Sequence, residues 1–204
     1  MHSHWNENQI HLRGRLTEVP RVSHINHDTT YCLLPLVVRR LSGAEDRLHV
    51  VAARPLLEGL TLEPGAPLGV RGEVRTFNNR SGVGSKLVVS VFAKALSQAE
   101  GAEDENRLEL AGTLCKPPAL RSTPLGRTIC DMILAVNRRY GRADYLPCIA
   151  WGSLAHRCGA MAVGDPLHLA GRLQSRDYTK EIDGQLQART AFEVSIMSLL
   201  PPGP

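Results

Sequence analysis

Aromatic residues are scarce in this chain. Its 204 residues include two tryptophans, four tyrosines and three phenylalanines, about 4% of the total. No apolar run approaches the ~18–20 residues needed to cross a bilayer. The opening stretch MHSHWNENQ lacks the basic segment and apolar run of a secretory signal. We therefore expect a cytoplasmic protein without a membrane segment.

The cysteines indicate neither a disulfide framework nor a redox motif. There are five, an odd number, and none stands in a Cys-x-x-Cys pair. We interpret them as reduced, mostly buried thiols of a cytosolic protein. They are Cys32, Cys115, Cys130, Cys148 and Cys158.

The sequence also lacks the patterns of a metal site or a catalytic centre. Two histidine pairs have near-ligand spacing, at positions 2 and 4 and at positions 24 and 27, but no cysteine or carboxylate pattern completes a tetrahedral site. There is no nucleophile elbow, P-loop or zincin motif, and Asp144 has no evident partner for acid–base work. We predict no bound metal, no cofactor and no enzymatic activity.

What the chain does have is an uneven charge distribution on a composition typical of folded proteins, with 43% hydrophobic residues. The net charge is +4. Residues 1–97 and residues 106–204 each carry 12 basic and 8 acidic side chains, whereas QAEGAEDE (98–105) carries four acids and no base. Two basic blocks joined by an acidic stretch predict two domains and a solvated linker.

The two blocks repeat one another. NQIHLRGRL (8–16) recurs as NRLELAGTL (106–114), and LVVRRLSGAEDRLHVVA (36–52) recurs as LAVNRRYGRADYLPCIA (134–150), both at an offset of 98. GVRGEV (69–74) recurs as HLAGRL (168–173) at an offset of 99. A register this constant predicts tandem duplication of a domain of about 90 residues. We assign residues 8–97 to the first unit, 98–105 to the linker and 106–200 to the second unit.

Each unit shows the same order of short elements. In the second unit we predict strands at 107–114, 130–139 and 144–152, a helix at 153–161, a strand at 164–178, a hairpin tip at 179–187 and a last strand at 188–200. The first unit has the same order, with its hairpin tip at 78–85. Three strands, a helix and a two-stranded hairpin are the order of an OB fold. The predicted fold class is all-β with a small helix per unit, as two tandem five-stranded OB barrels.

The second unit resembles bacterial single-stranded DNA-binding proteins. The resemblance rests on LAGTLCKPPALRSTPLGRTICDMILAVNRRY (110–140), ADYLPCIAWGSLA (143–155) and GDPLHLAGRLQSRDYTKEIDGQLQARTAFEV (164–194). The first unit is similar more loosely, through HLRGRL, LVVRR and GVRGEVRTFN. The resemblance implies a tandem OB-fold protein that binds single-stranded DNA with little sequence preference in replication, repair or recombination, in the cytoplasm and at the nucleoid.

The resemblance also implies a set of base-stacking residues. Four aromatic positions stack on bases in that family, and the matching positions here are Tyr140, Tyr145, Trp151 and Tyr178. The corresponding positions of the first unit are Leu41, Arg47, Ala53 and about Asn79, none of them aromatic. We therefore expect the first unit to be a degenerate copy with a pairing or structural role.

Physical chemistry supports such a surface independently. Every base has a π face, so stacking suits binding without sequence preference, and cations along the path neutralise phosphates. Tyr145 and Trp151 are six residues apart, hence on one face of an unbulged strand and about 20 Å apart. The predicted phosphate-binding residues are Arg138, Arg139, Arg142, Arg172, Arg176 and Lys180.

Other interpretations of the same residues stay open. Each aromatic side chain also fits packing in a core or a domain interface. An OB barrel also serves as a protein-docking module, as in primosome components, and the same surface also suits single-stranded RNA. The resemblance implies a homodimer that presents four barrels. Because the last seven residues are SLLPPGP (198–204), with no acidic residue after Glu193, we expect no tail-mediated recruitment of replication proteins.

Overall fold

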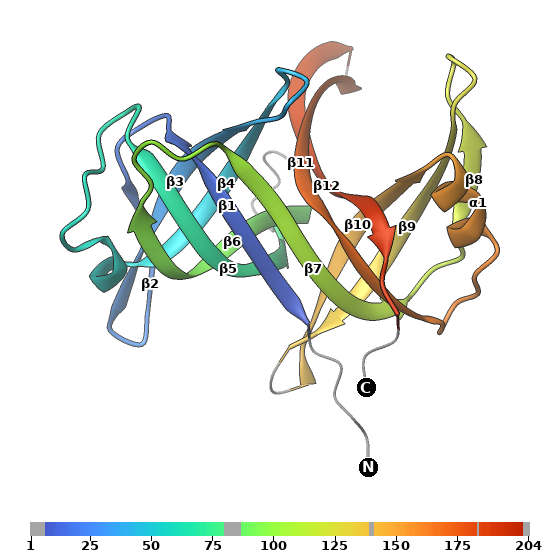
Figure 1. Cartoon of the computed structure of the whole chain (residues 1–204), viewed down its shortest axis with the longest axis horizontal. Coiled ribbons are helices and arrows are strands. Elements are labelled where there is room, and N and C mark those ends of the chain that lie inside the picture. The colour runs from blue at the N-terminus through green and yellow to red at the C-terminus, as the bar shows by residue number, and fades with distance from the viewer. Residues whose placement is uncertain (1–6, 80–86, 139–140, 183, 202–204) are drawn as a thin grey trace. The chain divides into compact units, whose positions relative to one another are not determined.

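In the computed structural model of this chain, residues 7–79, 87–138, 141–182 and 184–201 are described, without the side chains of Lys180 and Ile182 (Figure 1). Contacts divide the chain into two compact units. The first-barrel unit comprises Gln9–Asn106 and Gln174–Phe192. The second-barrel unit comprises Met1–Asn8, Arg107–Leu173 and Glu193–Pro204.

The first barrel is built from β1 (Asn8–Leu16), β2 (Arg21–Asn26), β3 (Thr29–Arg39), β4 (Glu45–Ala53), the 3₁₀ helix η1 (Arg54–Leu57), β5 (Pro67–Asn78) and β6 (Leu87–Gln98). Strand β1 pairs antiparallel with β3 and β5. The ring closes because β3 pairs with β4, β5 pairs with β6, and β4 runs parallel to β6.

The second barrel repeats this topology with β7 (Glu105–Leu114), β8 (Ala119–Ser122), β9 (Thr128–Asn137), β10 (Ala143–Trp151), α1 (Ser153–Gly159), β11 (Pro166–Ile182) and β12 (Gln185–Leu199). Strand β7 pairs with β9 and β11, β9 pairs with β10, and β10 runs parallel to β12. A closed five-stranded ring with a helix between its third and fourth strands is the OB arrangement, so the predicted fold class is confirmed.

Each barrel also carries a strand that the sequence did not predict. Strands β2 and β8 pair only on one side, with β3 and β9. All their residues are exposed. Neither shows the apolar–polar alternation of a half-buried strand, which is the signal that a strand prediction uses.

Alternating apolar residues fill both barrels. In β1 and β7, Leu12 and Leu110 face inward and are fully buried, and Leu36 and Leu134 do the same in β3 and β9. Burial on this scale is the main stabilising contribution to each barrel. Neither helix within the described ranges has the length and apolar character to span a membrane.

Two glycines allow the strands to approach closely in each barrel. A Cβ atom on Gly72 would meet the backbone of Phe92, and one on Gly171 would meet the backbone of Ser195, both well inside 3.0 Å. Gly14 and Gly112 are under the same constraint against β3 and β9. The repeat therefore preserves the positions at which the backbone itself requires glycine.

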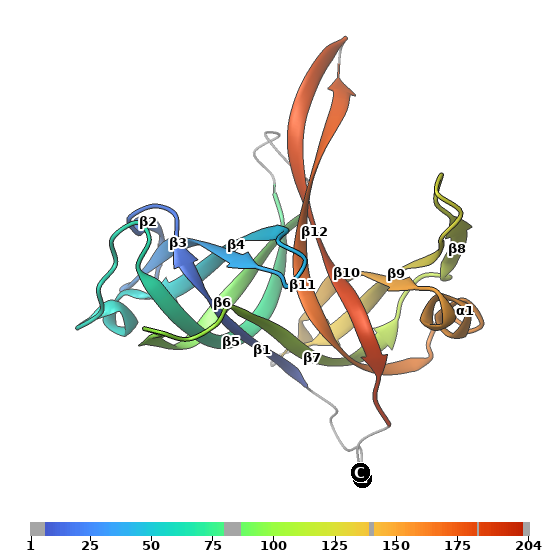
Figure 2. The ribbon, with the colours of Figure 1, turned by 45° about the horizontal axis from the view of Figure 1, so that its top comes forward.

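The hairpin of β11 and β12 is longer than the sequence predicted (Figure 2). The predicted tip spanned 179–187, but β11 continues to Ile182 and β12 begins at Gln185. Gly184 lies in the remaining turn with a positive φ of 75°. The residues of this segment are mostly polar and show no apolar–polar alternation, so no strand was predicted there. In the structure most of them nevertheless belong to β11 and β12.

The unit boundaries also differ from the simple division at the repeat. The segment Gln174–Phe192 belongs to the first-barrel unit, although the sequence placed it in the second repeat at 106–200. The acidic stretch predicted as a solvated linker is partly bonded to the first barrel. Asp104 accepts a hydrogen bond from the Arg39 backbone N–H at 2.7 Å, and Glu105 pairs with Arg13 at 3.0 Å.

Candidate nucleic-acid interface

Tyr145 and Trp151 lie on one outer face of β10. The pairing of β10 with β9 is uninterrupted from Ala143 to Trp151, so no bulge reverses the alternation. Tyr145 is 52% exposed and Trp151 is 39% exposed. The expectation that these two rings share a face is confirmed, and neither belongs to the barrel core.

The inward positions of β10 explain why the rings point out. Leu146, Cys148 and Ala150 are buried, and they alternate with the outward positions 145, 147, 149 and 151, among which Ile149 is also buried. The period of two residues in a strand then places Tyr145 and Trp151 at the surface. Pro147 lies between them and precedes the parallel pairing of Cys148 with Val194, so its missing N–H interrupts no bond of that pairing.

The turn between β9 and β10 contains a buried ion pair. The guanidinium of Arg138 donates to both carboxylate oxygens of Asp144, whose side chain is fully buried. The backbone N–H of Arg138 also donates to the carbonyl of Arg142 at 2.7 Å. Asp144, without an evident partner in the sequence, thus has one in Arg138, and the two residues join the end of β9 to the start of β10.

The same ion pair recurs in the first barrel. Arg40 donates from Nε to Oδ2 of Asp46 at 2.8 Å and from Nη2 to Oδ1 at 2.5 Å, and the Asp46 side chain is fully buried. Both partners stand 98 residues before Arg138 and Asp144. The pair therefore recurs although the first barrel lacks aromatic residues at the positions matching Tyr145 and Trp151.

Arg142 and Arg121 are exposed cations of the second-barrel unit. Arg142 lies in the β9–β10 turn and was predicted to bind phosphate. Arg121, in β8, was not predicted. Both Arg121 and Trp151 pair with Ile129 of β9, from opposite sides, which places Arg121 two strands from the Trp151 ring. Its Nε donates to Asp131 at 2.5 Å.

Arg176 and Tyr178 form a separate pair on β11, within the first-barrel unit. The guanidinium of Arg176 lies over the Tyr178 ring at 5.7 Å from its centroid, a cation–π contact. Arg176 is exposed and Tyr178 is half-buried. Between them Asp177 accepts a hydrogen bond from the Thr190 hydroxyl at 2.6 Å, which ties β11 to β12.

The hairpin that carries this pair is held by β4. The backbone N–H of Ser175 donates to Oδ1 of Asp46 at 2.9 Å, and the N–H of Arg47 donates to the Ser175 hydroxyl at 2.8 Å. Further along β4, the rings of His49 and Phe192 contact each other with centroids 5.4 Å apart. Partial burial and, to a lesser degree, the positive charge of Arg21 lower the pKa of His49 below 6.5.

Some of the predicted site residues fall outside the described part of the chain or are not exposed aromatic or basic side chains there. Tyr140 and Arg139 lie outside the described residues, as does the side chain of Lys180. Arg172 is half-buried on β11. In the first barrel, Leu41 and Arg47 are exposed and Ala53 is half-buried, so β4 presents no aromatic ring at these positions. The Arg–Asp pairs repeat at an offset of 98. At that offset the residue of the first repeat that corresponds to Tyr140 is Ser42 and not Leu41.

The chain is similar to known DNA-binding proteins. Residues 105–200 match the model of the single-strand binding protein family. Single-stranded DNA-binding protein A of Bacillus subtilis is 33% identical over 104 residues, which are 48% of this chain and 60% of that protein. The single-stranded DNA-binding protein of Thermus aquaticus is 28% identical over 91% of this chain and 81% of its own length. The chain thus spans about three fifths of the Bacillus protein.

The likeness extends to solved structures. The crystal structure of the wild-type Thermus aquaticus protein matches with a TM-score of 0.76 and 26% identity, over 97% of this chain and 93% of that one. A deletion mutant of the same protein matches with a TM-score of 0.75. Both barrels therefore have counterparts there, whereas the family model covers the second repeat.

Proposed function

We propose that this chain, whose residues 105–200 match the model of the single-strand binding protein family, is a tandem OB-fold member of that family and binds single-stranded DNA with little sequence preference. The observation that carries the proposal is the pair of exposed rings, Tyr145 and Trp151, on one face of β10. Flat apolar rings at the surface offer every base a stacking partner, whatever its sequence.

The chemistry of the described cations suits the phosphate backbone. Arg142 in the β9–β10 turn and Arg176 on the hairpin are exposed, so their guanidinium groups are accessible to phosphates. Phosphate neutralisation supplies most of the non-specific affinity for nucleic acid, and it makes binding weaken with salt. Arg138 is paired with Asp144. We propose that its other N–H groups also contact phosphate.

The proposed binding surface includes all the site residues predicted from the sequence. The base-stacking residues are Tyr140, Tyr145, Trp151 and Tyr178, and the phosphate-binding residues are Arg138, Arg139, Arg142, Arg172, Arg176 and Lys180. We add Arg121, because β8 places it two strands from Trp151.

We propose a positioning role for the first barrel. It has no aromatic residue at the positions matching Tyr145 and Trp151. Its strand β4 bonds Ser175, the residue next to Arg176, through Asp46 and Arg47. The degenerate barrel would then contribute to binding by holding the hairpin on which Arg176 and Tyr178 stand.

The family consists of DNA-binding proteins and not of enzymes, in agreement with the predicted absence of enzymatic activity. We propose that the chain acts at the nucleoid in the cytoplasm, in replication, repair or recombination. Family membership implies oligomerisation, and a homodimer that presents four barrels is the assembly we propose.

The decisive experiment is a titration of fluorescent oligo-dT, followed by anisotropy at low and high salt, with a duplex of equal length as the control. We expect tight binding to the single strand that weakens steeply with salt, and little binding to the duplex. Replacing Tyr140, Tyr145, Trp151 and Tyr178 together by alanine should abolish it. Unchanged affinity of that variant would refute the proposed surface.

The same titration separates the alternatives. Competition with oligo-U ranks RNA against DNA, since stacking alone does not read the 2′-hydroxyl. A protein-docking module would bind neither oligonucleotide. Leu125→Ala is the matched control, because Leu125 is 84% exposed in the β8–β9 loop of the same unit, outside the stacking set.

A further inference from the structure

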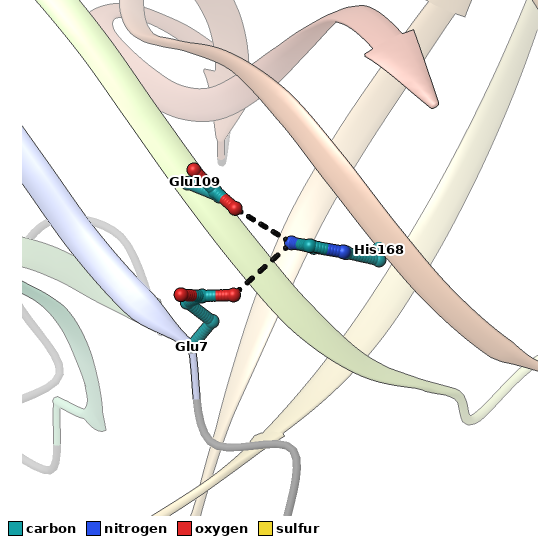
Figure 3. Close-up of side chains that lie close together, drawn as sticks. All are labelled: Glu7, Glu109 and His168. Atoms are coloured by element: carbon teal, nitrogen blue, oxygen red, sulfur yellow. Dashed lines mark hydrogen bonds and ion pairs between the residues drawn. The ribbon is translucent and has the colours of Figure 1, made fainter. Parts of the chain in front are cut away.

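Three side chains of the second-barrel unit, none of them among the proposed DNA-binding residues, converge on one point. Nε2 of His168, in β11, lies 2.8 Å from Oε1 of Glu109, in β7, and 3.2 Å from Oε2 of Glu7, which precedes β1 (Figure 3). Figure 3 shows both carboxylates directed at this one ring nitrogen. No spacing in the sequence signals the cluster, because its members come from three separate segments.

The hydrogen bond of the other ring nitrogen, Nδ1, determines whether Nε2 of a neutral ring is a donor or an acceptor. Nδ1 of His168 lies 2.9 Å from the carbonyl oxygen of Pro201. A carbonyl only accepts hydrogen bonds, so Nδ1 carries the proton. In a neutral ring Nε2 then presents a lone pair to two carboxylate oxygens. Three acceptors at these distances need either a proton or a metal cation among them.

We propose that Glu7, Glu109 and His168 bind a divalent transition-metal cation of the zinc type. Two carboxylates and one neutral imidazole supply a charge of −2, which a divalent cation balances. The mixed nitrogen and oxygen ligands suit zinc better than magnesium or calcium, which prefer oxygen alone. The hydrogen bond from Nδ1 to a backbone carbonyl is the contact that orients ligating histidines in known metal sites.

The spacing of the ligand atoms also fits. Tetrahedral zinc with bonds of about 2.0–2.1 Å holds its ligand atoms roughly 3.3 Å apart. The 3.2 Å separation of Nε2 from Glu7 is close to this value, and the 2.8 Å separation from Glu109 is shorter. All three ligand atoms lie within 4.8 Å of one another. The two glutamate side chains are 41% exposed, whereas that of His168 is 10% exposed. The glutamates therefore have room to adjust, and water has access to a fourth position.

Backbone pairing preorganises the three ligands. His168 pairs with Ala111 in the β7–β11 register, and Glu109 pairs with Ala170, so the two side chains are diagonal neighbours across the strands. The N–H of Ala111 donates to the carbonyl of Glu7 at 2.8 Å, which holds the third ligand beside them. A bound cation would fasten residue 7 and, through Pro201, the residues after β12 to the second barrel.

The test is a zinc titration of the full chain by calorimetry, combined with long-range ¹H–¹⁵N spectra of the histidine rings. We expect one zinc equivalent, a His168 ring without a proton on Nε2 in the zinc-bound protein, and a higher thermal midpoint. His168→Gln and Glu109→Gln should weaken this site at least about tenfold. His156→Gln is the matched control, because His156 is an exposed histidine on α1 of the same unit, and it should bind as the wild type does.

Three results would overturn the proposal. The first is no saturable zinc binding by the wild type. The second is an equivalent retained in both His168→Gln and Glu109→Gln, which would place the metal at other histidines. The third is a His168 ring that keeps protons on both nitrogens in saturating zinc, which identifies the occupant as a proton. The ring spectra use the wild-type protein, so they decide even if a variant does not fold.

Discussion

The backbone N–H of Ser175, in β11, donates a hydrogen bond to the buried carboxylate of Asp46, in β4, at 2.9 Å. The Ser175 hydroxyl accepts one in turn from the N–H of Arg47 at 2.8 Å. Asp46 is already bonded to Arg40, so one carboxylate holds both the β3–β4 turn of the first barrel and the hairpin that carries Arg176.

Ser175→Ala should loosen this attachment without unfolding either barrel. It removes one neutral hydrogen bond, worth about 0.5–1.5 kcal/mol, and leaves the Arg47 N–H to find another acceptor. We expect faster amide hydrogen exchange at Arg47 and through Gln174–Phe192. Ser122→Ala, at an exposed serine of β8, is the control. Equal exchange in the two variants would argue against the attachment.

Asp46→Asn and Asp144→Asn should both be strongly destabilising. Each leaves a guanidinium paired with a neutral amide at a fully buried position. Breaking such a pair costs about 3–5 kcal/mol, visible as a lower urea midpoint for the barrel concerned. The control is Glu45→Gln, which breaks the surface pair of Glu45 with Arg39 at 3.3 Å; we expect at most about 1 kcal/mol there.

Tyr145→Ala should reduce affinity for oligo-dT, whereas Tyr145→Phe should retain it. Loss of one stacked base costs roughly 1–3 kcal/mol, and phenylalanine keeps the ring that stacks. Anisotropy titration of the two variants at one salt concentration measures the difference. A phenylalanine variant as weak as the alanine variant would point to the hydroxyl group and not to stacking.

The contact between His49 and Phe192 should make the hairpin attachment sensitive to pH. The pKa of His49 is lowered in the folded protein, so the unfolded chain takes up its proton first as pH falls. The stability that depends on neutral His49 is complete above pH 6.5 and declines as pH falls below that value toward the lowered pKa. After division by the intrinsic exchange rate at each pH, the opening equilibrium of the hairpin should therefore increase more between pH 7 and pH 5 in the wild type than in His49→Gln.

A single thiol should react rapidly in the native protein. Cys115 is half-buried, whereas the other four cysteines are buried. Burial raises the pKa of Cys148, and it raises the pKa of Cys158 to about 11, so both are thiols and not thiolates near pH 8. Ellman's reagent should detect one fast equivalent, absent in Cys115→Ser, and the rest only on unfolding.

The sequence allowed accurate prediction wherever a pattern is local or repeats. The offset of 98 identified the duplication, and the order of elements identified the barrels. The alternation of β10 placed Tyr145 and Trp151 on one outer face, because an unbulged strand has a strict period of two. Strands β2 and β8 were not found, since fully exposed strands carry no apolar alternation.

Contacts that depend on burial or on tertiary structure could not be predicted from such patterns. The pairing of Arg138 with Asp144 spans only six residues, but a single arginine near an aspartate is common on any surface; burial alone distinguishes it. The bond between Asp46 and Ser175 joins residues 129 positions apart. The convergence of Glu7, Glu109 and His168 depends on the register of β7 with β11, which no single strand pattern determines.

Strand β11 begins in one compact unit and ends in the other, with consequences for any attempt to shorten the protein. A fragment that starts after Asp104 would retain the matched family sequence but lose Asp46 and Arg47. The amide of Ser175 would then face water in place of a carboxylate. Trimming this chain to its better-matched half would therefore also remove the attachment of the hairpin that carries Arg176 and Tyr178.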